Sequence, residues 1–146
     1  MIAVRMVRLI ESNSERLAAG LVEKLMKSER THDMRKVPAA ELRERSQEIY
    51  KNLGEWLLNK TESDIAGRYT ELGMRRSAQE IRFSHFLWAI VLTKEHLWHF
   101  LQREGAASSI EVYQQLELLH MLDGFFERAL YHAVQGYEKA RAAHAA

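Results

Sequence analysis

Residues 81–101 read IRFSHFLWAIVLTKEHLWHFL and form the most apolar stretch of the chain. Their apolar side chains cover most of the circumference of a helix, which is typical of a helix buried on most sides. The uninterrupted apolar run, residues 86–92, is far shorter than the roughly 20 residues that a membrane span requires. We therefore predict no membrane insertion and a central helix from Ser77 to about Arg103, around which the other helices pack.

The composition limits the class of protein. The 146 residues suit one domain, numbered 1–146, and a single Pro with seven Gly favours a few long elements. The formal net charge is only +1, whereas nucleic-acid-binding proteins usually carry a strong basic excess. The chain has no Cys, which excludes disulfides, thiolate catalysis and zinc–thiolate sites and is compatible with a reducing compartment. No signal peptide is visible, so the cytoplasm is the expected location.

Helical periodicity organises the rest of the chain. A short helical lead-in is expected at the N-terminus, and the polar stretch at residues 28–37 is expected to be a loop. Apolar positions recur every three to four residues in four further segments, approximately 15–27, 38–58, 62–72 and 110–140. The predicted fold class is all-α, a helical bundle or globin-like domain of about five helices, of which the two C-terminal ones are long.

The boundary before the central helix is predicted from glycine. Gly73 is expected to end the preceding helix, because Gly is the usual residue just past a helix C-terminus. Arg75 and Arg76 then fall in the connection, and Gly105–Ser109 form the last loop.

Metal chemistry was sought in Glu-x-x-His pairs, which bind two iron ions when they face inward on a helical bundle. The chain has two such pairs, Glu117 with His120 and Glu29 with His32. The first pair falls on the polar side of the last helix, and the second lies where the first long helix is ending. No further inward carboxylates are evident, so we predict no metal site.

Three histidines on the central helix, His85, His96 and His99, raise the question of haem. A His on a buried helix is the usual axial ligand of haem in a globin-like pocket. Hydrogen bonding to the backbone, or a place in a subunit interface, is the simpler interpretation. His85 is also conceivable as a phosphate acceptor, but it precedes the apolar run Phe86–Trp88, whereas such a His must be exposed.

A small-ligand pocket beside the central helix is the remaining candidate site. Such a pocket would involve His85, His96 or His99 with Trp88. Separately, Arg75 and Arg76, next to Tyr69, are able to form an anion site near helix ends. Surface arginines and core packing of Trp88 are the simpler interpretations. No nucleophile with a base, phosphate-binding loop or DNA-reading motif is visible, so we predict that the protein is not an enzyme.

Two stretches together resemble a known family. They are RYTELGMRRSAQEIRFSHFLWAIVLTKEHLW, residues 68–98, and LDGFFERALYHAVQGYEKA, residues 122–140. The first contains Tyr-x-x-Leu-Gly-x-x-Arg, then a short polar segment and a long apolar helix. The pattern is similar to the N-terminal domain of the RsbRD and RsbR stress-signalling proteins, and the similarity extends from about Leu17 to Ala140.

The resemblance implies an all-helical bacterial input domain, globin-like but generally without haem. It also implies a homodimer whose state passes to a downstream signalling protein or output domain, and it supplies no catalytic residues. The chain ends soon after the last helix, so it is expected to be either a stand-alone regulator or an excised part of a longer protein. We expect Trp98 and Phe100 near the dimer interface, because the long helices carry much apolar surface. The alternative is a sensor that binds haem or a small ligand.

Overall fold

The computed structural model describes residues 4–104 and 109–145. All regular structure in these two ranges is helical, which confirms the predicted all-α class. The elements are α1 (Val4–Ser12), α2 (Ser14–Lys27), η1 (Glu29–Lys36), α3 (Ala39–Lys51), η2 (Glu55–Asn59), α4 (Glu62–Ala78), α5 (Phe83–Glu104) and α6 (Ser109–Ala145). The predicted loop before the last helix largely falls on residues 105–108, outside the described ranges.

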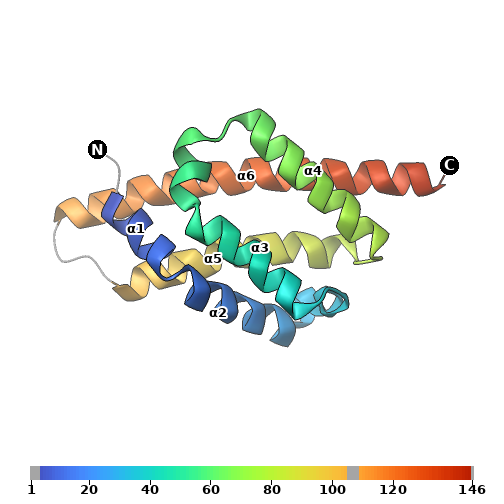
Figure 1. Cartoon of the computed structure of the whole chain (residues 1–146), viewed down its shortest axis with the longest axis horizontal. Helices are drawn as coiled ribbons and strands as arrows, with labels where there is room; N and C mark the ends of the chain where they lie inside the picture. Colours follow the sequence, from blue (N-terminus) through green and yellow to red (C-terminus); the bar gives the residue numbers. More distant parts are fainter. Residues whose placement is uncertain (1–3, 105–108, 146) are drawn as a thin grey trace.

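The helices form two layers (Figure 1). α6 runs the length of the molecule with α5 alongside it, and α3 and α4 cross in front of this pair. α1 and α2 close the remaining side against α3 and α5. The core lies between the layers, and α5 is buried over several faces, as its apolar circumference predicts.

Two segments differ from the helices that periodicity predicts. Residues 28–37 were expected to be a loop, but Glu29–Lys36 form a 3₁₀ segment in which Thr31, Asp33 and Met34 are buried. The Thr31 hydroxyl donates a hydrogen bond to the carbonyl of Leu25 at 2.8 Å, which folds the segment back onto α2. The helix expected at 38–58 ends at Lys51 and is followed by a short π-helix, η2.

The predicted boundary between α4 and α5 is wrong. α4 continues through Gly73 to Ala78, so Arg75 and Arg76 lie in its last turn, and α5 begins only at Phe83. Glu80 takes the left-handed conformation with φ 57°, and its amide donates to the carbonyl of Ser77. The amide of Ile81 donates to the carbonyl of Arg76, which completes a Schellman motif with Glu80 where Gly is usual.

Gly73 serves helix packing instead. A Cβ atom at Gly73 would lie 1.9 Å from the backbone oxygen of Ala133 on α6. A Cβ atom at Gly136 would lie 2.0 Å from the backbone oxygen of Thr70 on α4. The two glycines therefore let the backbones of α4 and α6 touch where the helices cross.

We expect Gly73→Ala and Gly136→Ala each to lower the free energy of unfolding by about 2–3 kcal/mol, because the added methyl group must separate two backbones. Gly67→Ala is the matched control on α4. It meets no atom within 4 Å, so it should raise stability by about 1 kcal/mol through helix propensity. Urea denaturation of the three variants measures the difference. Equal effects at positions 67 and 73 would contradict the close crossing.

Glu80→Gly should raise the free energy of unfolding by about 0.5–1 kcal/mol. Glycine removes the steric cost of the left-handed conformation, and part of that gain is offset by the greater entropy of the unfolded chain. Glu80→Ala keeps a Cβ atom and should bring no such gain. Thermal denaturation of the two variants tests the assignment of Glu80 as the residue that ends α4.

Candidate functional site

A cavity of about 80 Å³ lies between the two layers, and residues of α2, η1, α3, α4, α5 and α6 line it. Most of its wall is apolar and includes Leu25, Met34, Leu42, Ile49, Phe86 and Phe126. The polar part of the wall comes from α3 and α4, which contribute Arg45, Arg68, Tyr69 and Arg76. An apolar pocket with a few convergent polar groups is the usual form of a small-molecule site.

Arg76 is the most deeply buried charged residue of this wall, with 2% of its surface exposed. Its Nη1 group donates to Glu41 at 3.2 Å and to Gln79 at 2.9 Å. Its Nε group is buried and has no hydrogen-bond partner. Burial lowers the pKa of the Arg76 guanidinium, because low-dielectric surroundings disfavour its charged form.

Arg45 and Arg68 are the other two arginines of the polar wall. Because three of its side chains are arginines, we call it the positive wall. Arg68 Nη1 pairs with Glu48 at 2.7 Å, and its guanidinium lies 5.1 Å from the centre of the Trp56 ring. Arg45 Nε is 3.8 Å from Glu41, beyond hydrogen-bond distance, and is also buried without a hydrogen-bond partner. Burial, and then the nearby positive charge of Arg75, lower the pKa of Arg45.

Tyr69 places an aromatic ring beside these arginines. Its ring packs edge-on against Phe125 at 6.0 Å, and only 6% of the residue is exposed. Burial raises the pKa of the Tyr69 hydroxyl to about 12, so the phenol is neutral near pH 7. The cavity therefore combines an apolar body with a positively charged wall and no ionised tyrosine.

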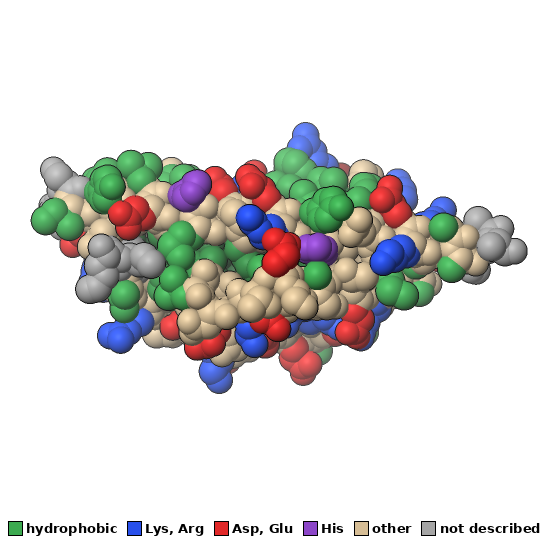
Figure 2. Space-filling model, turned by 90° about the horizontal axis from the view of Figure 1, so that it is seen from above, with side chains coloured by type: hydrophobic (Ala, Val, Ile, Leu, Met, Phe, Trp, Pro, Cys, Tyr) green, Lys and Arg blue, Asp and Glu red, His purple; other side chains and the backbone are tan. Residues whose placement is uncertain are grey.

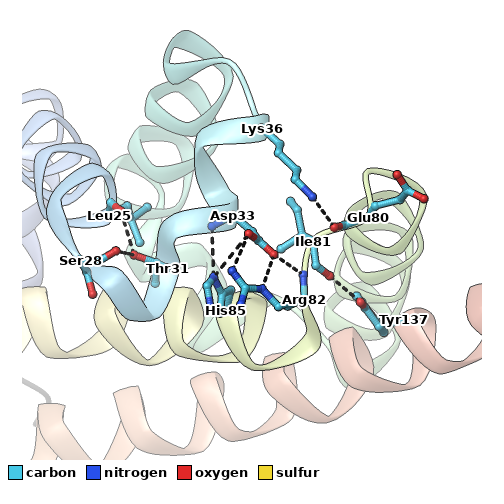
Figure 3. A network of polar contacts seen from close by, with 10 residues as sticks. All are labelled: Leu25, Ser28, Thr31, Asp33, Lys36, Glu80, Ile81, Arg82, His85 and Tyr137. Atoms are coloured by element: carbon cyan, nitrogen blue, oxygen red, sulfur yellow. Dashed lines mark hydrogen bonds and ion pairs between the residues drawn. The ribbon is translucent and has the colours of Figure 1, made fainter.

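A separate polar network joins η1 to the beginning of α5 and to α6 (Figure 3). Both carboxylate oxygens of Asp33 accept from the Arg82 side chain, at 2.9 and 3.0 Å, and one also accepts from the Arg82 backbone amide at 2.9 Å. These hydrogen bonds hold the pKa of Asp33 well below its usual range. Tyr137 of α6 donates to the carbonyl of Ile81, so the connection between α4 and α5 is held from both sides.

The sequence matches the family described as RsbT co-antagonist protein rsbRD N-terminal domain over residues 15–146. The chain belongs to this family. The matched range contains every residue that lines the cavity. Comparisons with curated proteins and with solved structures found no match. Membership identifies the chain as a signalling input domain of the stressosome type.

The residues predicted to bind a ligand divide into two groups in this RsbRD-type domain. Tyr69 and Arg76 line the central cavity, whereas His85, Trp88, His96 and His99 do not. Trp88 is half-buried and lies under Arg30, whose guanidinium is 4.7 Å from the ring centre. His99 is exposed. Of the six residues, the central cavity therefore brings together Tyr69 and Arg76.

The two buried histidines instead hold backbone groups. The Nδ1 atom of His85 accepts a hydrogen bond from the Asp33 amide at 3.1 Å (Figure 3). Nε2 of His96 lies 2.9 Å from the carbonyl of Leu17 and must donate, because a carbonyl oxygen only accepts. Gly20 permits this approach of α5 to α2, since a Cβ atom there would lie 3.1 Å from the His96 ring.

This arrangement does not fit a haem. An axial His needs a ring nitrogen that faces a large apolar pocket. Neither His85 nor His96 lines the cavity. A cavity of about 80 Å³ is also smaller than the roughly 150 Å³ that accommodates benzene.

The Glu-x-x-His pairs are likewise dispersed. Glu29, His32 and His120 are exposed, and Glu117 is half-buried. Within residues 4–104 and 109–145, no group of three or more His, Asp or Glu residues is placed to hold a metal ion. In the same ranges no helix is long and apolar enough to span a bilayer.

Sequence reasoning missed Arg45 and Arg68 as parts of the site. Arg45 lies among charged residues at positions 41–48, a pattern typical of a solvent-exposed helix face. Arg68 directly precedes Tyr69, but Arg75 and Arg76 were predicted to lie outside that helix. In the structure α4 carries all three arginines, and Glu41 and Glu48 of α3 pair with them.

The pH dependence of stability should report on His96. Burial lowers the pKa of His96 from 6.5 to about 4, with Lys24 and Arg103 acting in the same direction. The unfolded chain then binds more protons between these values, so stability is complete above about pH 6.5 and falls as the pH drops toward 4. The loss attributable to His96 is at most roughly 3 kcal/mol.

His96→Gln keeps a donor for the Leu17 carbonyl and removes the titration. We expect denaturation at pH 7, 5.5 and 4.5 to show a shallower decline for this variant than for the wild type. His99→Gln changes an exposed His on the same helix and should follow the wild type. Parallel curves for all three proteins would show that His96 is not buried in its neutral form.

Proposed function

We propose that the chain is a non-enzymatic signalling input domain that forms a homodimer and passes its state to a downstream signalling protein. The family supports the signalling role. The single structural observation that supports dimerisation is an exposed apolar surface at the beginning of α6. The proposal places the domain in the cytoplasm, in agreement with a chain that has no Cys.

This surface, here called the α6 stripe, consists of Ile110, Val112, Tyr113 and Leu116. Their exposed fractions are 71%, 48%, 64% and 57%. Ile110, Tyr113 and Leu116 follow one another at intervals of three residues, so they share one side of the helix. Figure 2 shows hydrophobic side chains gathered at the end of the molecule where α6 begins.

A second copy of the chain is the simplest cover for the α6 stripe. Large apolar side chains that lie together on a surface usually mark an interaction site. Two identical helices are able to pair through the same residues about a two-fold axis, so each copy covers the stripe of the other. The net charge of +1 leaves little overall repulsion between two copies.

The two residues that we predicted near the interface, Trp98 and Phe100, are not part of the α6 stripe. Phe100 is 2% exposed within the single chain and lies beneath Arg16, so it adds no area to an interface in this conformation. Trp98 is half-buried against the core. Both were predicted from the apolar circumference of α5, which the other helices of the same chain largely cover.

The alternative of a haem sensor is disfavoured by the geometry of His85 and His96. A sensor for a small ligand is favoured by a specific observation, the cavity with its charged wall. That function is compatible with a dimeric input domain and is developed below.

We expect the wild type to be a dimer by light scattering at about 50 µM, and Tyr113→Glu/Leu116→Glu to be a monomer, because buried carboxylates without partners disrupt an apolar interface. Tyr131→Glu is the matched control on α6, since Tyr131 is 59% exposed and lies outside the stripe. It should remain dimeric. A monomeric wild type would overturn the proposed dimer, and a dimeric double variant would exclude the α6 stripe as its interface.

A further inference from the structure

The positive wall of the central cavity has more charge than its carboxylates neutralise. Three arginines line the cavity, Arg45, Arg68 and Arg76, and the ion pairs that they form in the described residues involve two carboxylates, Glu41 and Glu48. Glu41 also pairs with Arg75, so three arginines share it at 3.2–3.8 Å. One positive charge is therefore in excess beside a cavity from which water is partly excluded.

Two donors on this wall lack acceptors. The Nε groups of Arg45 and Arg76 are buried, and neither has a hydrogen-bond partner. A buried N–H group without a partner costs about 1–3 kcal/mol, and more when it is charged. Such groups are rare in proteins, and a bound ion or water commonly explains them. A carboxylate is the kind of acceptor that guanidinium groups bind most strongly, and it offers two oxygens.

The opposite wall is suited to hydrocarbon. Met34, Phe86, Ala89, Ile90 and Phe126 face the cavity from η1, α5 and α6 and present no charged group. An inorganic anion would leave this wall without contacts, whereas an alkyl chain would pack against it. The volume of about 80 Å³ is roughly half of that which holds benzene, so the occupant must be small.

We propose that the cavity binds a short-chain aliphatic carboxylate of about two or three carbons, whose carboxylate is held by Arg45 and Arg76 and whose alkyl chain lies against Phe86 and Phe126. This proposal rests on the proposed function, because a signalling input domain needs a signal and the carboxylate would be that signal. Arg76 lies in the last turn of α4, immediately before the connection that the Asp33 network holds. The ligand would therefore contact both α3 and the end of α4.

Sodium propionate is the probe for this site. We expect saturable binding to the full chain by isothermal titration calorimetry, with a Kd on the order of 1 mM, and a melting temperature that rises with propionate concentration. Propionamide has nearly the same shape without the charge and should bind at least tenfold more weakly. Sodium chloride at the same ionic strength should not raise the melting temperature to the same extent.

Variants test the contribution of each wall of the cavity to ligand binding. Arg45→Gln should weaken propionate binding at least tenfold, whereas Arg43→Gln, an exposed position on the same helix that does not line the cavity, should leave it unchanged. Ala89→Leu fills the cavity without altering charge and should abolish binding. Both cavity variants should stay folded by circular dichroism. Arg76 is avoided because its loss would remove the buried hydrogen bonds to Glu41 and Gln79.

Several results would overturn the proposal. They are equal binding of propionate and propionamide, equal effects of Arg45→Gln and Arg43→Gln, or no saturable heat up to about 50 mM propionate, which would indicate a cavity filled by water. Light scattering on the same samples tests the proposed dimer independently of ligand binding. A dimer that binds no propionate removes the ligand class alone, whereas a monomer that binds propionate removes the dimer alone.

Discussion

The crossing of α4 and α6 is the contact on which the rest of the domain depends. Gly73 and Gly136 bring two backbones together where any Cβ atom would collide with a carbonyl oxygen. A helix pair this close has little freedom to slide, because protein interiors are tightly packed and backbone cannot be compressed. The crossing fixes the position of α4, and α4 carries Tyr69 and Arg76 into the space above α5.

The buried arginines follow from that placement. Arg76 is on the last turn of a helix that is pressed against α6, so its side chain can extend only toward α3. Glu41 on α3 meets it there and is shared with Arg45 and Arg75. Burial of charge is costly unless every donor finds an acceptor. Here the Nε groups of Arg45 and Arg76 have no acceptor. The positive wall thus lowers the stability of the folded domain. Binding sites commonly reduce stability in this way.

The histidines and Asp33 have a different role. His96 binds the Leu17 carbonyl and connects α5 to α2, while His85 and Asp33 connect η1 to the beginning of α5. Each of these bonds has a backbone group as one partner, so each fixes the path of the chain. The apolar α6 stripe lies at the N-terminal end of α6, away from this network, and is left uncovered by the single chain. The domain therefore separates the contacts that hold the fold from the surfaces open to partners.

The sequence by itself determined the all-α class and the central place of residues 83–104, because helical periodicity is a local property. The family pattern at residues 68–98 was also readable, and it included Tyr69 and Arg76. Only the tertiary structure decided that Gly73 packs against α6 while Glu80 ends α4, and that Arg45 leaves the solvent to join the cavity. Glycine is favoured both after a helix and at a close helix crossing, and one sequence does not distinguish the two uses. The burial of Phe100, His85 and His96 likewise depended on which helices of the same chain cover α5. That covering is decided by the packing of the whole domain and cannot be read from the sequence of one helix.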